Sequence, residues 1–219
     1  MKHYDIIQCT PEWWALKCGK ISGTRFGQVI SGRKNGLVYE LLNERLDGES
    51  FPDDFVTEDM QFGIDNEPIA CDLYSKQSGI EFVTIGAITS DVSKIHMASP
   101  DRISKDEKII LEAKCTQHGQ KQIERFFTGP DSTYMPQIIN YFAVDPDVEQ
   151  VHWISYCPSR PERPLVVCIF DRNTVVDVIK ATKINPERTI TVQDKVLEGC
   201  ARIKTIEAEL LDMEQKFVF

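Results

Sequence analysis

The sequence predicts an α/β domain in which a mixed central β-sheet is flanked by helices. Helical apolar spacing dominates roughly the first eighty residues, and short apolar runs follow that are interrupted by further helical segments. Helices before, between and after a group of strands are typical of a sheet covered by helices. A length of 219 residues suits one large domain with a sizeable core.

Helices are predicted first in the chain. Thr10, which precedes a proline, is a typical helix start, because its hydroxyl can cap the helix and proline fits the first turn. Residues 22–30 are expected to form a second helix, capped by the serine at position 22. Helical spacing recurs over residues 37–46 and 59–79, and Pro68 should kink or break the latter helix.

Strand-like apolar runs follow at residues 80–89, 94–99, 108–115, 149–157 and 164–171. Helical segments at 118–127 and 132–143 separate the third run from the fourth. From about residue 173 onward we expect a helical tail with a break near Pro186.

The net charge of −9 by itself disfavours a nucleic-acid partner, because phosphates repel an acidic protein. The charge is segregated, however. Residues 13–39 contain five basic residues and no acid, whereas residues 40–67 contain ten acids and one base. A local basic surface is therefore compatible with this sequence, although a solvated polar face is the simpler interpretation of one charge run.

The cysteines and the apolar runs exclude several classes of protein. Seven scattered cysteines without a C-x-x-C pair indicate reduced thiols, neither a disulfide framework nor a zinc site. No apolar run is long enough to cross a bilayer, and the first residues show no secretion signal. We therefore expect no membrane association and a cytoplasmic protein.

Asp101 and Glu112 predict a metal site. If the strand-like runs that flank them pair as a hairpin, both carboxylates can converge on one ion, and Mg²⁺ prefers such oxygen ligands with water and a substrate phosphate. Lys114 shares a face with Glu112, because alternate residues of a strand point the same way, so it could orient a water that the ion activates. The alternative is a simple salt bridge between Glu112 and Lys114, since E-x-K tripeptides are common.

Four sequence blocks together resemble a known nuclease family. "ASPDR" and "IILEAKC" (98–102 and 109–115) resemble the PD-(D/E)xK motif. The segments "TPEWWALKCGKISGTRFGQVI" (10–30), "FGIDNEPIACDLY" (62–74) and "YMPQIINYF" (134–142) resemble the phage lambda exonuclease-like (viral recombinase) branch of that superfamily. The matching positions are Gly63, Glu67, Pro68, Ala70, Pro100, Asp101, Glu112, Lys114, Tyr134 and Gln137.

This resemblance implies a restriction-endonuclease-like core and a 5′-to-3′ exonuclease that hydrolyses one strand of double-stranded DNA and leaves 3′ single strands for phage-type recombination. It implies Mg²⁺, with Mn²⁺ as a substitute, held by Asp101 and Glu112 with Glu67 nearby. It also implies Lys114 beside the attacking water and Gln137 as a residue that places the water or the scissile phosphate.

The opening block is expected to bind the 5′-phosphate of a DNA end. Lys17 stands where the family has arginine, and Thr24 stands where it has serine. Both lie near a predicted helix start, which suits an anion. The expected pocket consists of Lys17, Ser22 and Thr24, assisted by Arg25 or Lys34, and DNA contacts are also expected from Trp14 and Tyr134. For Trp14 a core position is the alternative.

The resemblance further implies a ring-shaped homotrimer, a single-strand annealing recombinase as partner, and a phage- or prophage-encoded protein acting in a bacterial host. The single domain would comprise a helical, DNA-end-binding part (1–60), a catalytic core (61–172) and a helical C-terminal part (173–219). Two alternatives stay open: a structure- or site-specific endonuclease of the same superfamily, and a non-catalytic DNA-binding or assembly protein. A nuclease with an iron–sulfur cluster is disfavoured, because no cysteine cluster follows Lys114.

Overall fold

A computed structural model describes residues 1–50, 56–181 and 186–218, with only the backbone of residues 34 and 35, and confirms the mixed α/β fold. Its central sheet has five strands in the order β2-β5-β6-β7-β8. β6 and β7 run parallel, whereas the other neighbours run antiparallel. The strands are β2 (Phe82–Val83), β5 (Arg102–Ser104), β6 (Ile109–Cys115), β7 (Gln150–Tyr156) and β8 (Leu165–Phe170).

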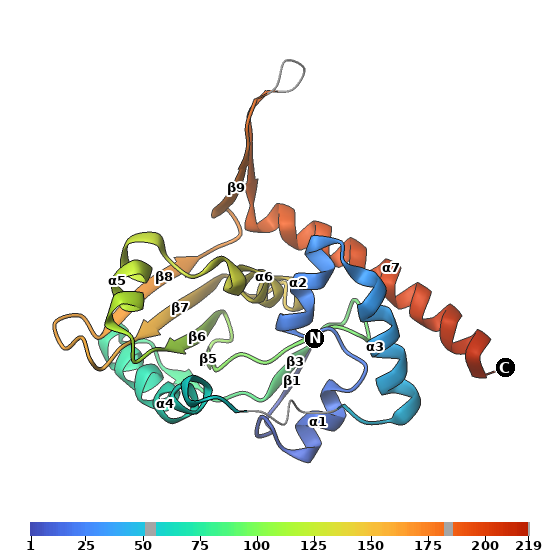
Figure 1. The fold of residues 1–219 in the computed structure, drawn as a ribbon, viewed down its shortest axis with the longest axis horizontal. Coiled ribbons are helices and arrows are strands. Elements are labelled where there is room, and N and C mark those ends of the chain that lie inside the picture. The colour runs from blue at the N-terminus through green and yellow to red at the C-terminus, as the bar shows by residue number, and fades with distance from the viewer. Residues whose placement is uncertain (51–55, 182–185, 219) are drawn as a thin grey trace.

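Helices cover the two faces of this sheet (Figure 1). On one face, α4 (Glu58–Ser78) packs Ala70, Cys71 and Tyr74 against Leu111, Ala113 and Ile154 of the sheet. The other face contributes Ile110, Val151 and Trp153 to a larger core that includes α6 (Met135–Val144). The shorter helix α5 (Gly119–Thr128) contacts β7 and β8, and the 3-10 turn Ser132–Tyr134 leads from it to α6.

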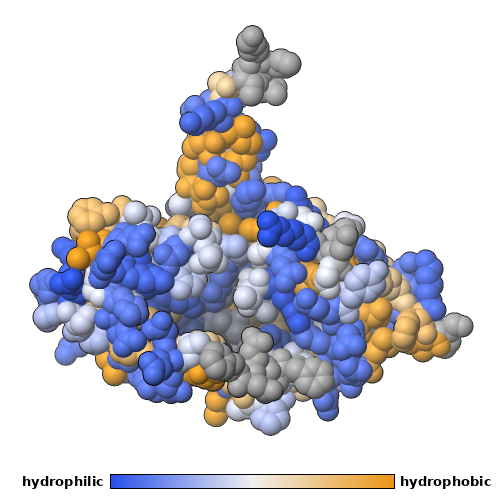
Figure 2. All heavy atoms as spheres, viewed as in Figure 1, coloured by the Kyte–Doolittle hydropathy of each residue, from blue (hydrophilic) through white to orange (hydrophobic). Residues whose placement is uncertain are grey.

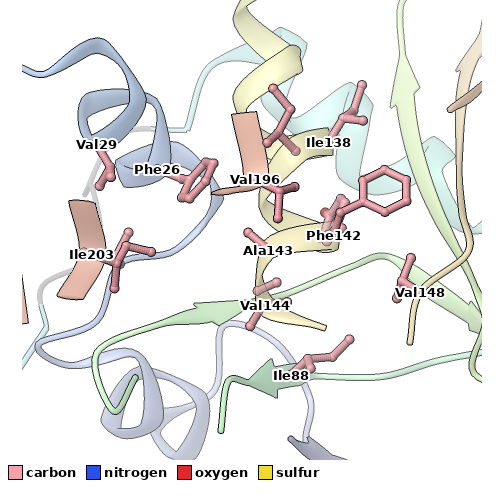
Figure 3. Packing of buried hydrophobic residues seen from close by; sticks show 14 of the residues in the cluster. Phe26, Val29, Ile88, Ile138, Phe142, Ala143, Val144, Val148, Val196 and Ile203 are labelled. Atoms are coloured by element: carbon pink, nitrogen blue, oxygen red, sulfur yellow. The ribbon is translucent and has the colours of Figure 1, made fainter. Parts of the chain in front are cut away.

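A helical layer extends the larger core away from the sheet. It consists of α2 (Gly23–Ser31), α3 (Lys34–Asp47) and the long α7 (Val192–Val218). α2 and α7 pack against α6, and α3 packs against α2 and α7. Figure 3 shows Phe26 and Val29 of α2 facing Val196 and Ile203 of α7. Gly199 permits this approach, since a Cβ there would lie 2.4 Å from the Phe26 ring. This layer fixes the position of α2 relative to α6.

A small three-stranded sheet holds the N-terminal segment against the body. It pairs β1 (Lys2–Tyr4) with β3 (Ala87–Thr89), and β3 with β4 (Met97–Ala98), while α1 (Pro11–Lys17) packs beside it. The strand β1 and the strand β5 were not predicted. The expected single strand over 80–89 is also wrong, because its two ends join different sheets as β2 and β3.

The C-terminal part differs from the predicted helical tail. Before α7 the chain forms an antiparallel hairpin of β9 (Val175–Ile179) and β10 (Arg188–Thr191). Figure 1 shows it projecting from the body, and Figure 2 shows apolar surface along it. Its β-branched residues favour strand over helix, which explains the correction. Val175, Val178 and Ile179 are exposed on this hairpin.

Several predicted helix boundaries match the structure. Thr10 caps α1, with its side chain accepting from the Trp13 amide and proline in the first turn. Ser22 precedes α2 as expected, although its side chain makes no capping hydrogen bond. A break at Pro68, one of the two expected outcomes, does not occur, because α4 continues through this residue. The carbonyl that loses its amide partner belongs to Ile64, an exposed residue, so water can take the place of the amide. Among the described residues, no helix combines the length and apolarity that a membrane crossing needs.

Candidate functional site

The hairpin of β5 and β6 brings Asp101 and Glu112 together. Arg102 pairs with Leu111 in the antiparallel register, so the preceding Asp101 lies level with Glu112 on the next strand. Asp101 Oδ2 also accepts a hydrogen bond of 2.7 Å from the Ala113 amide. The two carboxylates line the same cavity.

Strand alternation places Glu112 and Lys114 on the cavity side of β6. Leu111 and Ala113 point to the opposite face and pack against α4. Glu112 is buried, with 1% of its surface exposed, and both of its oxygens have donors. Lys114 Nζ donates to Oε1, and the Tyr141 hydroxyl donates to Oε2. The salt bridge that was the alternative interpretation therefore exists, but it forms part of a larger polar cluster.

The cavity has a volume of about 440 Å³ and joins the carboxylates to the predicted phosphate-binding block. It lies between α1, α2, α6 and the β5–β6 hairpin. Its lining includes most of the candidates from the sequence, namely Lys17, Ser22, Thr24, Asp101, Glu112, Lys114, Tyr134 and Gln137.

The N-terminus of α2 opens into this cavity beside α6. Gly23 allows the two helices to approach, since a Cβ there would lie 3.0 Å from Cγ of Gln137. The first amides of a helix have no partner within it, and Ser22 uses no side-chain bond to cap them. The helix start thus offers backbone donors and the hydroxyls of Ser22 and Thr24 to an anion.

Lys17 ends α1 at the rim of the same cavity. Its Nζ lies 4.8 Å from the ring centre of Trp13 and 4.6 Å from that of Trp14. Trp13 is buried and donates from Nε1 to Gly86 O and Ser99 Oγ, both at 3.1 Å. Trp14 is partly buried outside the cavity lining and packs edge-on against Trp13. The structure therefore gives Trp14 a supporting position beside Lys17.

Arg25 and Lys34 were expected to assist in binding the 5′-phosphate. The structure does not bring Arg25 into the cavity, because its guanidinium forms a two-pronged ion pair with Glu44 of α3. Glu44 also accepts from the Gly19 amide at 2.8 Å, so this pair braces the turn before α2. An assisting role for Arg25 is not supported. The side chain of Lys34, at the start of α3, lies outside the described residues.

A second cavity of about 460 Å³ adjoins the first, and Lys114 and Tyr134 line both. Glu67 of α4 lines the second cavity. It lies on the helix face of Ala70, Cys71 and Tyr74, which places it over the β6 strand. Tyr134 lies beneath the Lys114 ammonium, 5.4 Å from ring centre to Nζ.

Burial and neighbouring negative charges raise the pKa of two carboxylates in this site. Burial, and then the charge of Glu112, raise the pKa of Asp101 well above its ordinary value. The same two causes raise the pKa of Glu67. Burial alone would lower the pKa of Lys114, but the charges of Glu112 and Asp101 raise it overall. The cluster thus concentrates negative charge around one lysine.

Asp101 and Glu112, with Glu67 on the other side of Lys114, are the residues that could hold a metal ion. Within the described part of the chain, no three histidine, cysteine or acidic side chains are grouped closely enough to hold an ion by themselves. Mg²⁺ does not need such a cage, because it commonly takes one or two carboxylates and fills its shell with water and phosphate oxygens. The carboxylate oxygens of Asp101 and Glu112 are hard donors, and a bound Mg²⁺ would offset the repulsion between their negative charges.

Sequence reasoning missed part of the lining. Tyr141 was not among the site residues expected from the sequence, yet its hydroxyl donates to Glu112 and accepts from the Gln137 side-chain amide at 2.9 Å. Its spacing of one helical turn after Gln137 was the available signal. Gln8 and Ser99 also line the cavity, and no local pattern marked them.

Comparison with known proteins identifies the family and the fold of this chain. Residues 12–147 match the YqaJ-like viral recombinase domain. That segment contains the carboxylate pair and nearly the whole opening block. No curated protein sequence matches the chain.

Solved structures share the fold. An alkaline exonuclease, LHK-Exo, from Laribacter hongkongensis is 23% identical, with a TM-score of 0.72 over 95% of this chain and 98% of that one. Its complex with dAMP matches over the same shares with a TM-score of 0.73. A phage-related exonuclease from Haemophilus somnus 129PT is 14% identical, with a TM-score of 0.53 over 89% of this chain and 96% of that one.

The family expected from the motif blocks is therefore confirmed. The solved structures that share the fold of this chain are exonucleases. The match covers well over half of the chain, including the cavity residues from Lys17 to Tyr141. This chain belongs to the family of the YqaJ-like viral recombinase domain.

Proposed function

We propose that this protein is a Mg²⁺-dependent 5′-to-3′ exonuclease that hydrolyses one strand of double-stranded DNA. One observation carries the proposal: a single cavity contains both the Asp101–Glu112 pair with Lys114 and the start of α2 with Lys17. Its volume, about 440 Å³, suits one small ligand such as a nucleotide. A terminal phosphate at α2 would place the next phosphodiester toward the carboxylates.

Asp101 and Glu112 would hold Mg²⁺, and Glu67 would stand close to it. When bound, the ion would polarise a phosphoryl oxygen and lower the pKa of a coordinated water. Lys114 would orient the attacking water and neutralise charge that develops on the phosphate. Gln137, on the opposite wall of the cavity, would place the water or the phosphate. Mn²⁺, which accepts similar oxygen ligands, is expected to substitute.

Recognition of the 5′ end would depend on Lys17, Ser22 and Thr24. The terminal phosphate is a dianion, which a helix start with unpaired amides and a nearby ammonium can bind. One of the solved structures that share this fold is LHK-Exo in complex with dAMP, a mononucleotide. Such a product is what stepwise removal from an end would release.

The family also supports a proposal for the wider biological role. The released 3′ strands would serve phage-type recombination through a single-strand annealing recombinase, in the cytoplasm of a bacterial host. A homotrimeric ring is the expected assembly. Exposed apolar residues on the β9–β10 hairpin and at the end of α7 are available for contacts between copies, among them Val178, Ile179, Leu211 and Phe217. Light scattering at micromolar concentration should give a trimer mass, and a monomer would contradict the ring.

The first experiment follows the digestion of linear duplex DNA labelled at either the 5′ or the 3′ end. With Mg²⁺ we expect the 5′ label to be released first as a mononucleotide, with no reaction in EDTA. Asp101→Asn, assayed in parallel, should be inactive and exclude a contaminating nuclease.

The alternatives give different products. A structure- or site-specific endonuclease would cut closed circular or branched DNA into defined fragments. A DNA-binding or assembly protein would bind DNA equally well in EDTA and release no label. Either result would overturn the exonuclease proposal.

A further inference from the structure

The hydroxyl of Tyr141 connects the two walls of the cavity. It donates to Glu112 Oε2 and accepts from Gln137 Nε2 at 2.9 Å. The Tyr141 side chain is buried, with 1% of its surface exposed, and it lines the cavity. This hydrogen bond joins β6, which carries Glu112, to the face of α6 that carries Gln137.

The chemistry of the three groups fixes the direction of these hydrogen bonds. An ionised carboxylate only accepts, and Glu112 lies closer to the Tyr141 hydroxyl than the other acceptor, Ser99 O at 3.5 Å, so the single hydroxyl proton goes to Glu112. Its oxygen can then only accept from Gln137, which turns the Nε2 end of the amide toward Tyr141. The Oε1 atom and the second N–H of the Gln137 amide then remain for contacts with water or phosphate. In the described part of the chain no hydrogen bond reaches Oε1.

The same contact fixes Glu112. Lys114 donates to Oε1 and Tyr141 donates to Oε2, so a hydrogen bond to each oxygen fixes the orientation of the carboxylate. Each carboxylate oxygen can accept more than one hydrogen bond or metal bond, so both keep capacity toward the cavity.

The α6 helix that carries this hydroxyl is itself held in place. Asn140, fully buried, donates from Nδ2 to Met97 O at 3.0 Å and contacts His96 Nε2 through Oδ1 at 2.7 Å. These bonds tie α6 to β4, the strand that leads to Asp101. The position of Tyr141 is therefore determined by buried contacts on both sides of the cavity.

We infer that Tyr141 is a positioning residue for the proposed reaction, which orients Glu112 toward the metal and Gln137 toward the water or the phosphate. The inference rests on the proposed function. It goes beyond the motif blocks, which include Gln137 but assign nothing to Tyr141. Groups that orient metal ligands typically change metal affinity or activity by ten- to a hundredfold when removed.

The test removes only the hydroxyl, in Tyr141→Phe. We expect turnover to fall by about ten- to a hundredfold, with a smaller change in KM for DNA, because DNA contacts are kept. Binding of Mn²⁺, measured by calorimetry without DNA, should weaken as well. Tyr74→Phe is the matched control, since Tyr74 is also buried and its hydroxyl forms a hydrogen bond of 2.8 Å with His152 Nδ1. Neither Tyr74 nor His152 lines either cavity.

A double-mutant cycle tests the link to Gln137. If Tyr141 acts partly through that amide, Tyr141→Phe should lower turnover less in a Gln137→Met background than in the wild type. Additive losses, or equal turnover in Tyr141→Phe and Tyr74→Phe, would overturn the inference. Should Tyr141→Phe fail to fold, Gln137→Met alone still tests it, because loss of the donor should also weaken Mn²⁺ binding through Glu112.

The outcomes separate this inference from the proposed function. Wild-type protein that digests no DNA would refute the exonuclease, whereas the Mn²⁺ affinities of the two tyrosine variants would still decide the role of Tyr141. An active wild type with unchanged Tyr141→Phe would refute only the positioning role.

Discussion

Asp101 and Ala113 are joined by a hydrogen bond of 2.7 Å from the Ala113 amide to Asp101 Oδ2, at the point where the β5–β6 ladder ends. The carboxylate satisfies an amide that the neighbouring strand no longer reaches. One Asp101 oxygen is thereby fixed to the backbone of the strand that carries Glu112 and Lys114. The geometry of the proposed metal site is thus determined by the end of a β-ladder.

The first prediction concerns the two carboxylates. Asp101→Asn keeps an oxygen that can accept from the Ala113 amide, so the fold should be retained while cleavage is abolished. Glu112→Gln should do the same. DNA binding, measured by fluorescence anisotropy, should stay within a fewfold of the wild type. Asp65→Asn is the control, because this exposed carboxylate of α4 lies outside both cavities. Normal cleavage by either site variant would remove that carboxylate from the mechanism.

Lys114→Met tests whether the lysine acts in catalysis or only in a salt bridge. As a donor to the transition state, its loss should lower turnover by about a hundredfold or more. The variant also leaves buried Glu112 without its cation, so some stability should be lost. Turnover is therefore to be measured per folded molecule, after thermal unfolding has been recorded. Reduced stability with unchanged turnover would support the salt bridge alone.

His96 predicts a pH dependence of stability. Burial lowers its pKa to about 4, although the bond to Asn140 opposes this shift. Between the ordinary value of about 6.5 and 4, the unfolded chain binds a proton that the folded chain does not, so stability falls as the pH falls through this window. The loss from His96 at pH 5 is about 2 kcal/mol. Burial lowers the pKa of His152 as well, which adds to the same trend.

Urea unfolding at pH 7 and pH 5 measures this loss. His96→Gln, which keeps a polar group beside Asn140, should be less stable at pH 7 but should lose less stability on going to pH 5. An equal loss in both proteins would show that His96 is not the cause.

The sequence predicted the parts of the site that depend on local pattern. The predicted strand over 108–115 contains β6, and strand alternation then placed Glu112 and Lys114 on one face. The start of α2 followed from Ser22. Family resemblance added Glu67 and Gln137, which no spacing rule connects to β6.

Long-range contacts account for the rest. The run 80–89 contains Gly86, where a Cβ would meet Ile6 O at 2.1 Å, so the N-terminal segment crosses there and divides the run between two sheets. The sequence alone could not show that Arg25 forms an ion pair with Glu44, because the two residues come together only in the folded chain. The antiparallel pair β9–β10 was missed because the tail as a whole was expected to be helical, although the valines of β9 favour a strand.

The final prediction concerns the 5′ end. Lys17 lies at the cavity rim with the start of α2, so Lys17→Ala should remove much of the preference for a 5′-phosphate. Rates are compared on duplexes that carry 5′-phosphate or 5′-hydroxyl ends. The wild type should favour the phosphate, and Lys17→Ala should narrow the difference while retaining hydrolysis once digestion has begun. Arg33→Ala is the matched control, because this exposed residue belongs to the same basic stretch but does not line the cavity. Lysine offers a point charge where arginine can make two parallel bonds, so the preference should be moderate, roughly tenfold. Equal rates of the wild type on both ends, or digestion that starts from 3′ ends, would show that the pocket at α2 does not recognise the terminal phosphate.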